Sequence, residues 1–191
     1  MKKMAIILGS GSPRRRELLE KIGITKFSVS TPEVEETYPD NLSPAQIVCH
    51  LSAIKSRAIA SGEDDIVITA DTMVFLDDKR LGKPADEADA LAMLTALQGR
   101  RHTVCTGVTV RRGSRVLTEA EETAVIFRPA TEKELLSYIR SGEPMDKAGA
   151  YGIQGLGSLL VEGIEGDFFN VMGLPLLRLS RMLRQFGVTL L

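Results

Sequence analysis

Residues 66–76 read IVITADTMVFL, the densest β-strand pattern in the chain. Ile66, Val67 and Ile68 form a continuous apolar run, which is typical of a central strand that is covered on both faces. Asp71 interrupts this strand and Thr72 follows it. Ligands of open α/β sheets collect at the carboxyl ends of strands, so Asp71 is well placed to hold a metal ion or a water molecule. A structural carboxylate that caps a turn is the alternative.

The sequence on either side of this strand predicts an α/β fold with a mixed sheet. Met4–Leu8 predicts a short buried strand, followed by a helix that Ser12 caps and Gly23 ends. A hairpin turn is expected at 77–80, and a second hairpin joins 102–111 to 115–127. Cap signals place further helix starts at Ser43, Asp86, Thr131 and Pro175. Strands and helices that interleave with hairpins are typical of this class.

Length and composition exclude several classes of protein. A chain of 191 residues predicts one domain over 1–191, with room for two lobes. The formal net charge of −1 lacks the basic surplus of a nucleic-acid binder. Cys49 and Cys105 match no zinc or redox spacing, so we expect two buried thiols in a reducing cytosol. Met4–Leu8 is too short for a signal sequence or a membrane span, which predicts a cytoplasmic protein.

Three arginines, Arg14 to Arg16, stand in the first turn of the first predicted helix. Free amide groups and the helix dipole already make this position positive, so the cluster predicts an anion at the loop Ser10–Ser12, with Arg14 converging on it. The arginines could instead point into solvent or pair with nearby acids. A dinucleotide-binding fingerprint is a weaker alternative, because Arg14 stands where its third glycine belongs, and no Walker loop occurs anywhere.

Further carboxylates and lysines extend this pattern. Glu33, Glu35 and Glu36 could supply a second carboxylate beside Asp71, although such a cluster is also typical of a solvated loop. Paired oxygen ligands with open positions suit Mg²⁺ or Mn²⁺ bound jointly with phosphates. Lys83 follows the hairpin that begins at Asp71 and can reach back as a phosphate ligand.

Residues 146–155 read DKAGAYGIQG, a segment in which glycines allow the backbone to approach a ligand. Gln154 offers an amide donor and an acceptor, the combination that a base edge requires. A tight glycine-rich connection is the alternative. His50 and His102 fit no ligand pattern and are expected to be structural. The anion loop, the acids, the lysines and this amide together describe metal-assisted attack on a nucleoside phosphate.

Six ordered motifs make the chain resemble the Maf proteins, which are nucleoside triphosphate pyrophosphatases also named for septum formation inhibition. The resemblance spans essentially the whole chain and rests on LGSGSPRR (8–15), VEET (34–37), ADT (70–72), GKP (82–84), DKAG (146–149) and NVMGLP (170–175). It implies an elongated mixed sheet flanked by helices, with two lobes, a central cleft and assembly as a homodimer.

The same resemblance implies hydrolysis between the α and β phosphates to a nucleoside monophosphate and pyrophosphate, with a divalent Mg or Mn ion. Asp71 would be the catalytic base or a metal ligand, and Glu36 the second acid on the metal. The phosphates would be held by Ser10, Arg14, Lys55 and Lys83. Arg14, Thr72 and Gln154 align with positions that separate the substrate branches, and YGIQG (151–155) looks like the branch that acts on dTTP and UTP.

Two departures from the family pattern stand out. Gly9 replaces a common alanine, which should only loosen the loop, and Phe168 replaces a common tyrosine and so removes a hydroxyl. Two other functions remain open. One is a nucleotide-binding regulator of cell division that acts through a protein partner, and the other is a pyrophosphatase for modified or non-canonical purine nucleotides.

Overall fold

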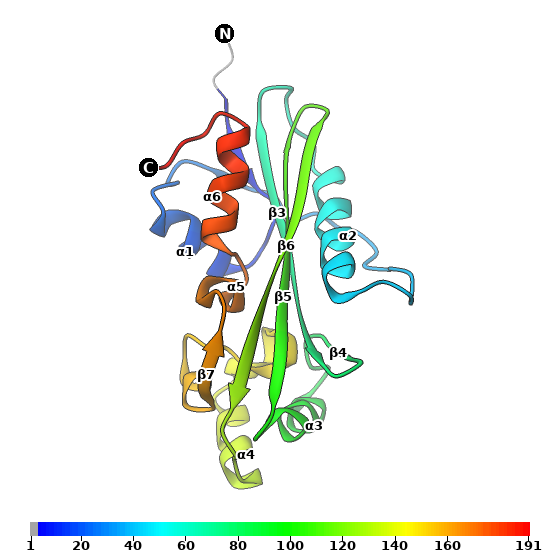
Figure 1. Ribbon diagram of the computed structural model, residues 1–191, viewed down its shortest axis with the longest axis vertical. Helices are drawn as coiled ribbons and strands as arrows, with labels where there is room; N and C mark the ends of the chain where they lie inside the picture. The colour runs from blue at the N-terminus through cyan, green and yellow to red at the C-terminus, as the bar shows by residue number, and fades with distance from the viewer. Residues whose placement is uncertain (1–3) are drawn as a thin grey trace. The chain divides into compact units, whose positions relative to one another are not determined.

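The computed structural model describes residues 4–191, and in this part of the chain seven strands form one sheet in the order β2-β1-β3-β5-β6-β7, with β4 paired to β3 (Figure 1). The strands are β1 (Ile6–Leu8), β2 (Ser28–Val29), β3 (Ile66–Leu76), β4 (Lys79–Leu81), β5 (Arg101–Arg112), β6 (Arg115–Phe127) and β7 (Val161–Glu165). β1 is parallel to β2 and β3, whereas β4 and β7 are antiparallel to their partners. The predicted mixed α/β sheet is therefore confirmed.

Six α-helices and three 3₁₀-helices accompany the sheet within residues 4–191. They are α1 (Pro13–Lys21), α2 (Pro44–Arg57), α3 (Glu87–Leu97), α4 (Glu132–Arg140), α5 (Phe168–Met172), α6 (Leu176–Gln185), η1 (Glu143–Asp146), η2 (Ala148–Ala150) and η3 (Leu156–Leu159). The side chains of Ser43, Asp86 and Thr131 cap their helices as predicted. Ser12 is the N-cap residue of α1, but its side chain makes no capping hydrogen bond, so that part of the prediction is wrong.

The described chain divides into two compact units. Unit 1 comprises the residues up to Asp71 together with Thr106–Glu121 and Gly173–Leu191, and unit 2 comprises Thr72–Cys105 and Glu122–Met172. The boundary crosses β3 between Asp71 and Thr72, so the central strand contributes to both units. Two units agree with the two expected lobes, and the central cleft and the single domain over 1–191 stay predictions.

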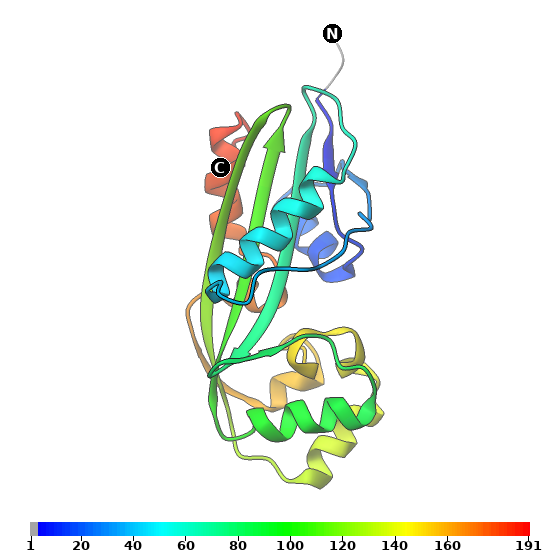
Figure 2. The ribbon, with the colours of Figure 1, turned by 90° about the vertical axis from the view of Figure 1, so that its right-hand side faces the viewer.

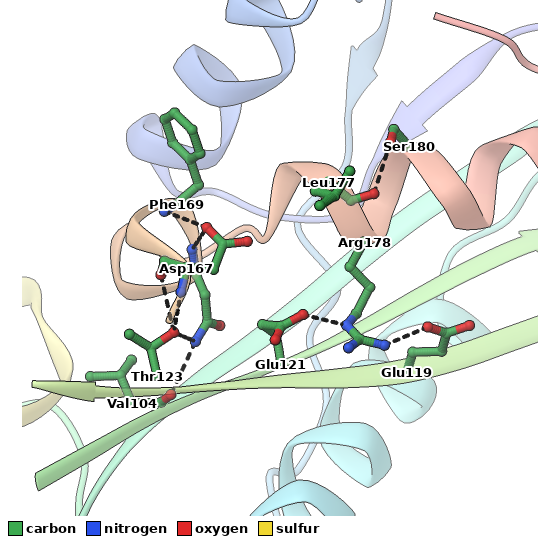
Figure 3. A network of polar contacts seen from close by, with 10 residues as sticks. Val104, Glu119, Glu121, Thr123, Asp167, Phe169, Leu177, Arg178 and Ser180 are labelled. Atoms are coloured by element: carbon green, nitrogen blue, oxygen red, sulfur yellow. Dashed lines mark hydrogen bonds and ion pairs between the residues drawn. The ribbon is translucent and has the colours of Figure 1, made fainter. Parts of the chain in front are cut away.

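In unit 1, helices cover both faces of the sheet: α2 lies on one face and α6 on the other (Figures 1 and 2). α2 approaches β5 so closely at Gly107 that a Cβ there would lie 2.2 Å from the carbonyl oxygen of Val48. On the other face, Arg178 of α6 pairs with Glu119 and Glu121 of β6, each at 2.7 Å (Figure 3). These contacts pack β5 and β6 between the two helices. The neighbouring strand β3 continues through Asp71 to Leu76, so the expectation that Asp71 interrupts this strand is wrong.

Unit 2 has its own apolar core. Its buried members come from strands, from α-helices and from η2, and include Val74, Leu94, Phe127, Leu135, Ile139 and Ala150. α3 and α4 both contribute to this core, and Figure 2 shows them against each other. The glycine-rich segment beyond residue 148 is therefore anchored on a rigid base.

Both cysteines are free thiols, but only Cys105 is buried. Cys49 is half-buried, so the expectation of two buried thiols is wrong for this residue. Its burial is nevertheless sufficient to raise the pKa of the Cys49 thiol. Within residues 4–191, no helix has the length and apolar character needed to cross a membrane.

Candidate active site

The hydroxyl group of Ser10 is the hydrogen-bonding centre of the loop after β1. Ser10 is buried, and its Oγ accepts hydrogen bonds from the backbone N–H of Ser12 at 3.2 Å and from Nη1 of Arg15 at 3.1 Å. Because both donors use lone pairs of this oxygen, the hydroxyl proton is left to donate to an incoming anion. This geometry suits the predicted phosphate-binding role of Ser10.

Arg15 is a site residue that sequence reasoning missed. Its Nε donates to the carbonyl oxygen of Gly173 at 2.8 Å, which ties α1 to the segment before α6. Burial lowers the pKa of the Arg15 guanidinium, and the negative charges of Asp71 and Glu36 oppose that shift. A signal was present, because Arg15 lies three and four residues before Leu18 and Leu19, on the apolar stripe of the helix.

Arg14, the arginine selected from the sequence, is half-buried in the first turn of α1. Its positive charge acts on Arg15 and contributes to the lowered pKa of that neighbour. Two cations at one helix N-terminus repel each other and the helix dipole, an arrangement that a bound phosphate would relieve.

Asp71 and Glu36 meet at Lys55, which is the centre of the candidate site in unit 1. Nζ of Lys55 lies 2.5 Å from Oδ1 of Asp71 and 2.9 Å from Oε1 of Glu36. The Lys55 side chain is 14% exposed and that of Asp71 7%, whereas that of Glu36 is 54% exposed. α2 supplies the lysine from its last turn and β3 supplies the aspartate, so two rigid elements set this contact.

The second oxygen of Asp71 is the most informative atom of the site. Oδ2 is buried and has no hydrogen-bond partner within residues 4–191. An unsatisfied buried carboxylate oxygen is costly unless a cation or a proton donor joins it. The residues therefore fit a divalent metal ion: Asp71 offers a free oxygen, and the exposed carboxylate of Glu36 is held on the same lysine.

The described residues contain no cluster of three or more His, Cys, Asp or Glu side chains that could hold a metal by themselves. A metal bound by Asp71 and Glu36 would keep open positions, which suits joint binding with phosphate oxygens. Of the three glutamates in the loop before α2, Glu36 is the one that pairs with Lys55. Glu33 and Glu35 are exposed to solvent.

Thr72, Lys83 and Gln154 belong to unit 2. Thr72 is half-buried, whereas the side chains of Lys83 and Gln154 are exposed. The carbonyl oxygen of Gly82 accepts a hydrogen bond from the N–H of Gly149 at 3.0 Å, which fastens the turn before Lys83 to the glycine-rich segment that leads to Gln154. Convergence of these side chains with Asp71 stays a prediction.

The family model described as Maf-like protein matches residues 5–186 of the chain. The chain belongs to the Maf family. This Maf protein is 50% identical over 183 residues to a dTTP/UTP pyrophosphatase of Symbiobacterium thermophilum, covering 95% of this chain and 94% of the relative. It is 48% identical over 184 residues to a dTTP/UTP pyrophosphatase of Bacillus cereus, with 96% of each chain covered.

The fold of this Maf protein also has a counterpart among solved structures. A HAM1 protein from Coxiella burnetii superimposes with a TM-score of 0.52 at 14% identity, covering 96% of this chain and 100% of that chain. An identity this low shows a common fold and nothing more.

The family motif at 170–175 has a structural explanation in this Maf protein. Asn170 is buried in unit 2, where Nδ2 donates to the carbonyl oxygen of Val104 at 3.1 Å and to Oγ1 of Thr123 at 2.9 Å (Figure 3). Oδ1 of Asp167 accepts from the N–H groups of Phe169 and Asn170. These bonds fix the short helix α5 on the sheet.

The two departures of this Maf protein from the family pattern differ in kind. Gly9 does more than loosen the loop, because a Cβ at this position would lie 2.2 Å from Cδ1 of Ile59 and 2.5 Å from Cγ2 of Thr69. The glycine thus makes room for two packed side chains. Phe168 is 40% exposed and contacts the ring of Phe169 edge to face.

Proposed function

We propose that the protein is a nucleoside triphosphate pyrophosphatase that converts dTTP and UTP to the nucleoside monophosphate and pyrophosphate. The observation that carries this proposal is the Asp71 carboxylate, with one oxygen on Lys55 and the other buried without a partner. The relatives named dTTP/UTP pyrophosphatase support the substrate class.

Asp71 acts as the general base in the proposed reaction. Lys55 pairs with Oδ1, which leaves Oδ2 to orient a water molecule and accept its proton. The water oxygen forms a bond to the α-phosphorus, and the bond from that phosphorus to the oxygen bridging the α and β phosphates breaks. The electron pair of the broken bond leaves with pyrophosphate.

Cationic residues stabilise the charge that moves onto pyrophosphate. Arg14 and Lys83 bind phosphate oxygens, the Ser10 hydroxyl donates to one of them, and Lys55 adds charge beside the acids. Asp71 and Glu36 would hold the divalent metal, Mg²⁺ or Mn²⁺. When bound, the metal neutralises phosphate oxygens and lowers the pKa of a coordinated water.

Gln154 reads the base in this proposal. Thymine and uracil present an N–H donor beside a carbonyl acceptor, and one amide side chain can pair with both. Cytosine presents an acceptor and an amino group at the same places, so an amide fixed in one orientation discriminates against it.

Incubation with dTTP, UTP, CTP, GTP, ITP and 7-methyl-GTP, with Mg²⁺ or Mn²⁺, tests the function by chromatography of the products. Equal amounts of monophosphate and pyrophosphate from dTTP and UTP are expected. Turnover confined to purine nucleotides would keep the reaction and refute the base assignment. Nucleotide binding without turnover under any metal would favour the regulator of cell division instead.

The proposed enzyme acts as a homodimer in the cytoplasm, without nucleic acid or membrane partners. Light scattering on the purified protein measures the mass directly. A mass equal to one chain of 20.8 kDa across a hundredfold range of concentration would refute the dimer.

A further inference from the structure

The segment Tyr151–Gly157, which carries Gln154, lies outside regular helices and strands until η3 begins at Leu156. Side chains pair its N–H groups at Gly152, Leu156 and Gly157, whereas the carbonyl oxygens of Gly155 and Gly157 accept from backbone N–H groups that follow in the chain. We call this segment the Gln154 loop. The loop and the side chains of Tyr138, Glu143 and His102 that contact it belong to unit 2.

Glu143, the first residue of η1, binds the far end of the Gln154 loop with both carboxylate oxygens. Oε2 accepts from the N–H of Leu156 at 2.8 Å, and Oε1 accepts from the N–H of Gly157 at 3.0 Å. Two successive amides thus share one carboxylate, as they would share a bound anion. Charge-assisted bonds of this kind are about twice as strong as neutral ones.

Tyr138 extends the contact to the near end of the loop. Its hydroxyl donates to Oε1 of Glu143 at 2.7 Å and accepts from the N–H of Gly152 at 3.0 Å. Tyr138 lies in α4 and its side chain is buried in the core of unit 2. Glu143 therefore determines the position of backbone groups on both sides of Gln154.

The loop lies so close to this carboxylate that side chains are excluded. A Cβ on Gly155 would lie 2.2 Å from Oε2 of Glu143, and a Cβ on Gly157 would lie 2.3 Å from the carbonyl oxygen of Gly152. The two glycines that follow Gln154 are thus required by close approach to Glu143 and by the fold of the loop on itself, not by flexibility.

A second anchor holds the start of the loop. The hydroxyl of Tyr151 lies 2.7 Å from Nε2 of His102, and both side chains are buried. The Tyr151 and His102 rings pack edge to face with each other and with Phe127. With the start fixed by packing, the course of residues 152–157 depends on the Glu143 carboxylate.

The charge state of Glu143 suits this role. Burial acts to raise the pKa of Glu143, but hydrogen bonds from Tyr138, Gly157 and Leu156 outweigh it and lower the pKa below its usual value. Nζ of Lys147 adds a bond to the carbonyl oxygen of Glu143 at 2.6 Å and pairs with Asp146 at 2.8 Å. The carboxylate therefore stays ionised at neutral pH.

We propose that Glu143 is a positioning residue that fixes the Gln154 loop and thereby the choice of base. This inference rests on the proposed function, in which Gln154 reads thymine or uracil. An amide side chain that can turn by 180° pairs with cytosine as well as with uracil, because rotation exchanges its donor and acceptor. Discrimination therefore also requires that this amide is held at one place relative to the base, and the Glu143 carboxylate fixes the backbone that sets this place.

The test compares Glu143→Gln with wild type by the ratio of kcat/KM for dTTP to that for dCTP. Glutamine keeps the size of the side chain but places an N–H₂ group against a backbone N–H, so at least one loop bond is lost. The ratio is expected to fall about tenfold, equal to about 1.4 kcal/mol, with the loss for dTTP mainly in KM. Hydrogen exchange at the Leu156 and Gly157 amides should accelerate in the same variant.

Glu134→Gln is the matched control. Glu134 is also a glutamate of unit 2 that accepts backbone and side-chain bonds, but it caps the opposite end of α4 through Thr131 and Arg128. Its replacement should leave the base ratio unchanged. Should Glu143→Gln not fold, Tyr138→Phe removes the hydroxyl that bridges Glu143 and Gly152 but keeps the Glu143 bonds to Leu156 and Gly157. It is expected to lower the ratio about threefold, roughly half the free-energy change of the tenfold effect.

An unchanged base ratio in a folded Glu143→Gln or Tyr138→Phe protein would refute the positioning role while leaving the enzyme intact. Unchanged exchange at Leu156 and Gly157 would refute the clamp itself, independently of any activity. A wild-type protein that hydrolyses no nucleotide would instead refute the proposed function, and its exchange data would still test the clamp.

Discussion

Replacement of Asp71 by asparagine separates the chemical role of this side chain from its structural one. The change keeps the shape of the side chain and removes its negative charge. The Asp71 side chain is 7% exposed, with Oδ1 at 2.5 Å from Nζ of Lys55 and Oδ2 without a partner within residues 4–191. The asparagine oxygen can still accept from Lys55, and the amide nitrogen takes the place of Oδ2.

The expected loss of stability is small because two effects oppose each other. Lys55 loses one counter-ion, which costs about 3–5 kcal/mol when a buried charge is left alone, but a carboxylate no longer has to be desolvated. Lys55 also keeps Glu36 at 2.9 Å as a second partner. We expect a net loss of at most about 2 kcal/mol, equal to roughly 4–8 °C in Tm for a chain of this size.

The expected loss of activity is large. Removing a general base costs about 10²–10⁴ in rate, and the same substitution removes a carboxylate from the predicted metal pair. We expect kcat/KM for dTTP to fall at least about a thousandfold, equal to about 4 kcal/mol of transition-state stabilisation. Asp78→Asn, in the exposed turn after β3, is the matched control and should be fully active.

The assay measures pyrophosphate release and Tm on the same preparations of wild type and both variants. A folded Asp71→Asn protein that keeps more than about a tenth of the wild-type kcat/KM would refute the role of Asp71, because a tenfold loss is below the contribution of a general base. A loss of activity that is no larger than the fraction of protein unfolded at the assay temperature would show a structural role instead.

Three further predictions concern other parts of the molecule. Lys55→Met leaves a buried carboxylate without its main cation and should lower the free energy of unfolding by about 3 kcal/mol in urea titrations; a change below 1 kcal/mol would show that solvent already screens the pair. Gly9→Ala should destabilise by about 1–3 kcal/mol through its contacts with Ile59 and Thr69, and adding Ile59→Val and Thr69→Ser, which remove both contacting methyl groups, should cost less Tm than the same pair costs in wild type; an equal cost would exclude the clash. Burial lowers the pKa of His102 to about 4, so only the unfolded chain binds this proton between pH 4 and 6.5, and stability should fall by about 3 kcal/mol as the pH drops through that range; a His102→Gln protein with the same pH profile would refute this.

Local sequence signals predicted most of the fold. The apolar run at 66–76, the hairpin at 102–127 and the capping residues Ser43, Asp86 and Thr131 are confirmed within a few residues. Each signal depends on neighbours within one or two turns of the chain, where spacing alone determines which face is apolar. The short helix α5 was missed, because its cap at Asp167 follows a glycine-rich stretch without apolar periodicity.

The candidate site was predicted in part. Asp71, Glu36 and Lys55 were selected, and the structure brings these three together. Arg14 was selected from the sequence and Arg15 was not, although the spacing of Arg15 from Leu18 and Leu19 places it on the apolar stripe of α1. Glu143 could not have been found, because its partners at 138, 156 and 157 are neither at helical nor at strand spacing.

The sequence by itself determined the mixed α/β class, the family and the residue types that the proposed chemistry requires, because short-range patterns and ordered motifs encode them. Tertiary structure alone decided which charges meet and which backbone groups need a partner. Lys55 serves both Asp71 and Glu36, and Glu143 holds two amides beyond Gln154, because packing brings distant segments within hydrogen-bond distance. Burial then makes those pairings matter, since a charge or an amide removed from water must find its partner inside the protein.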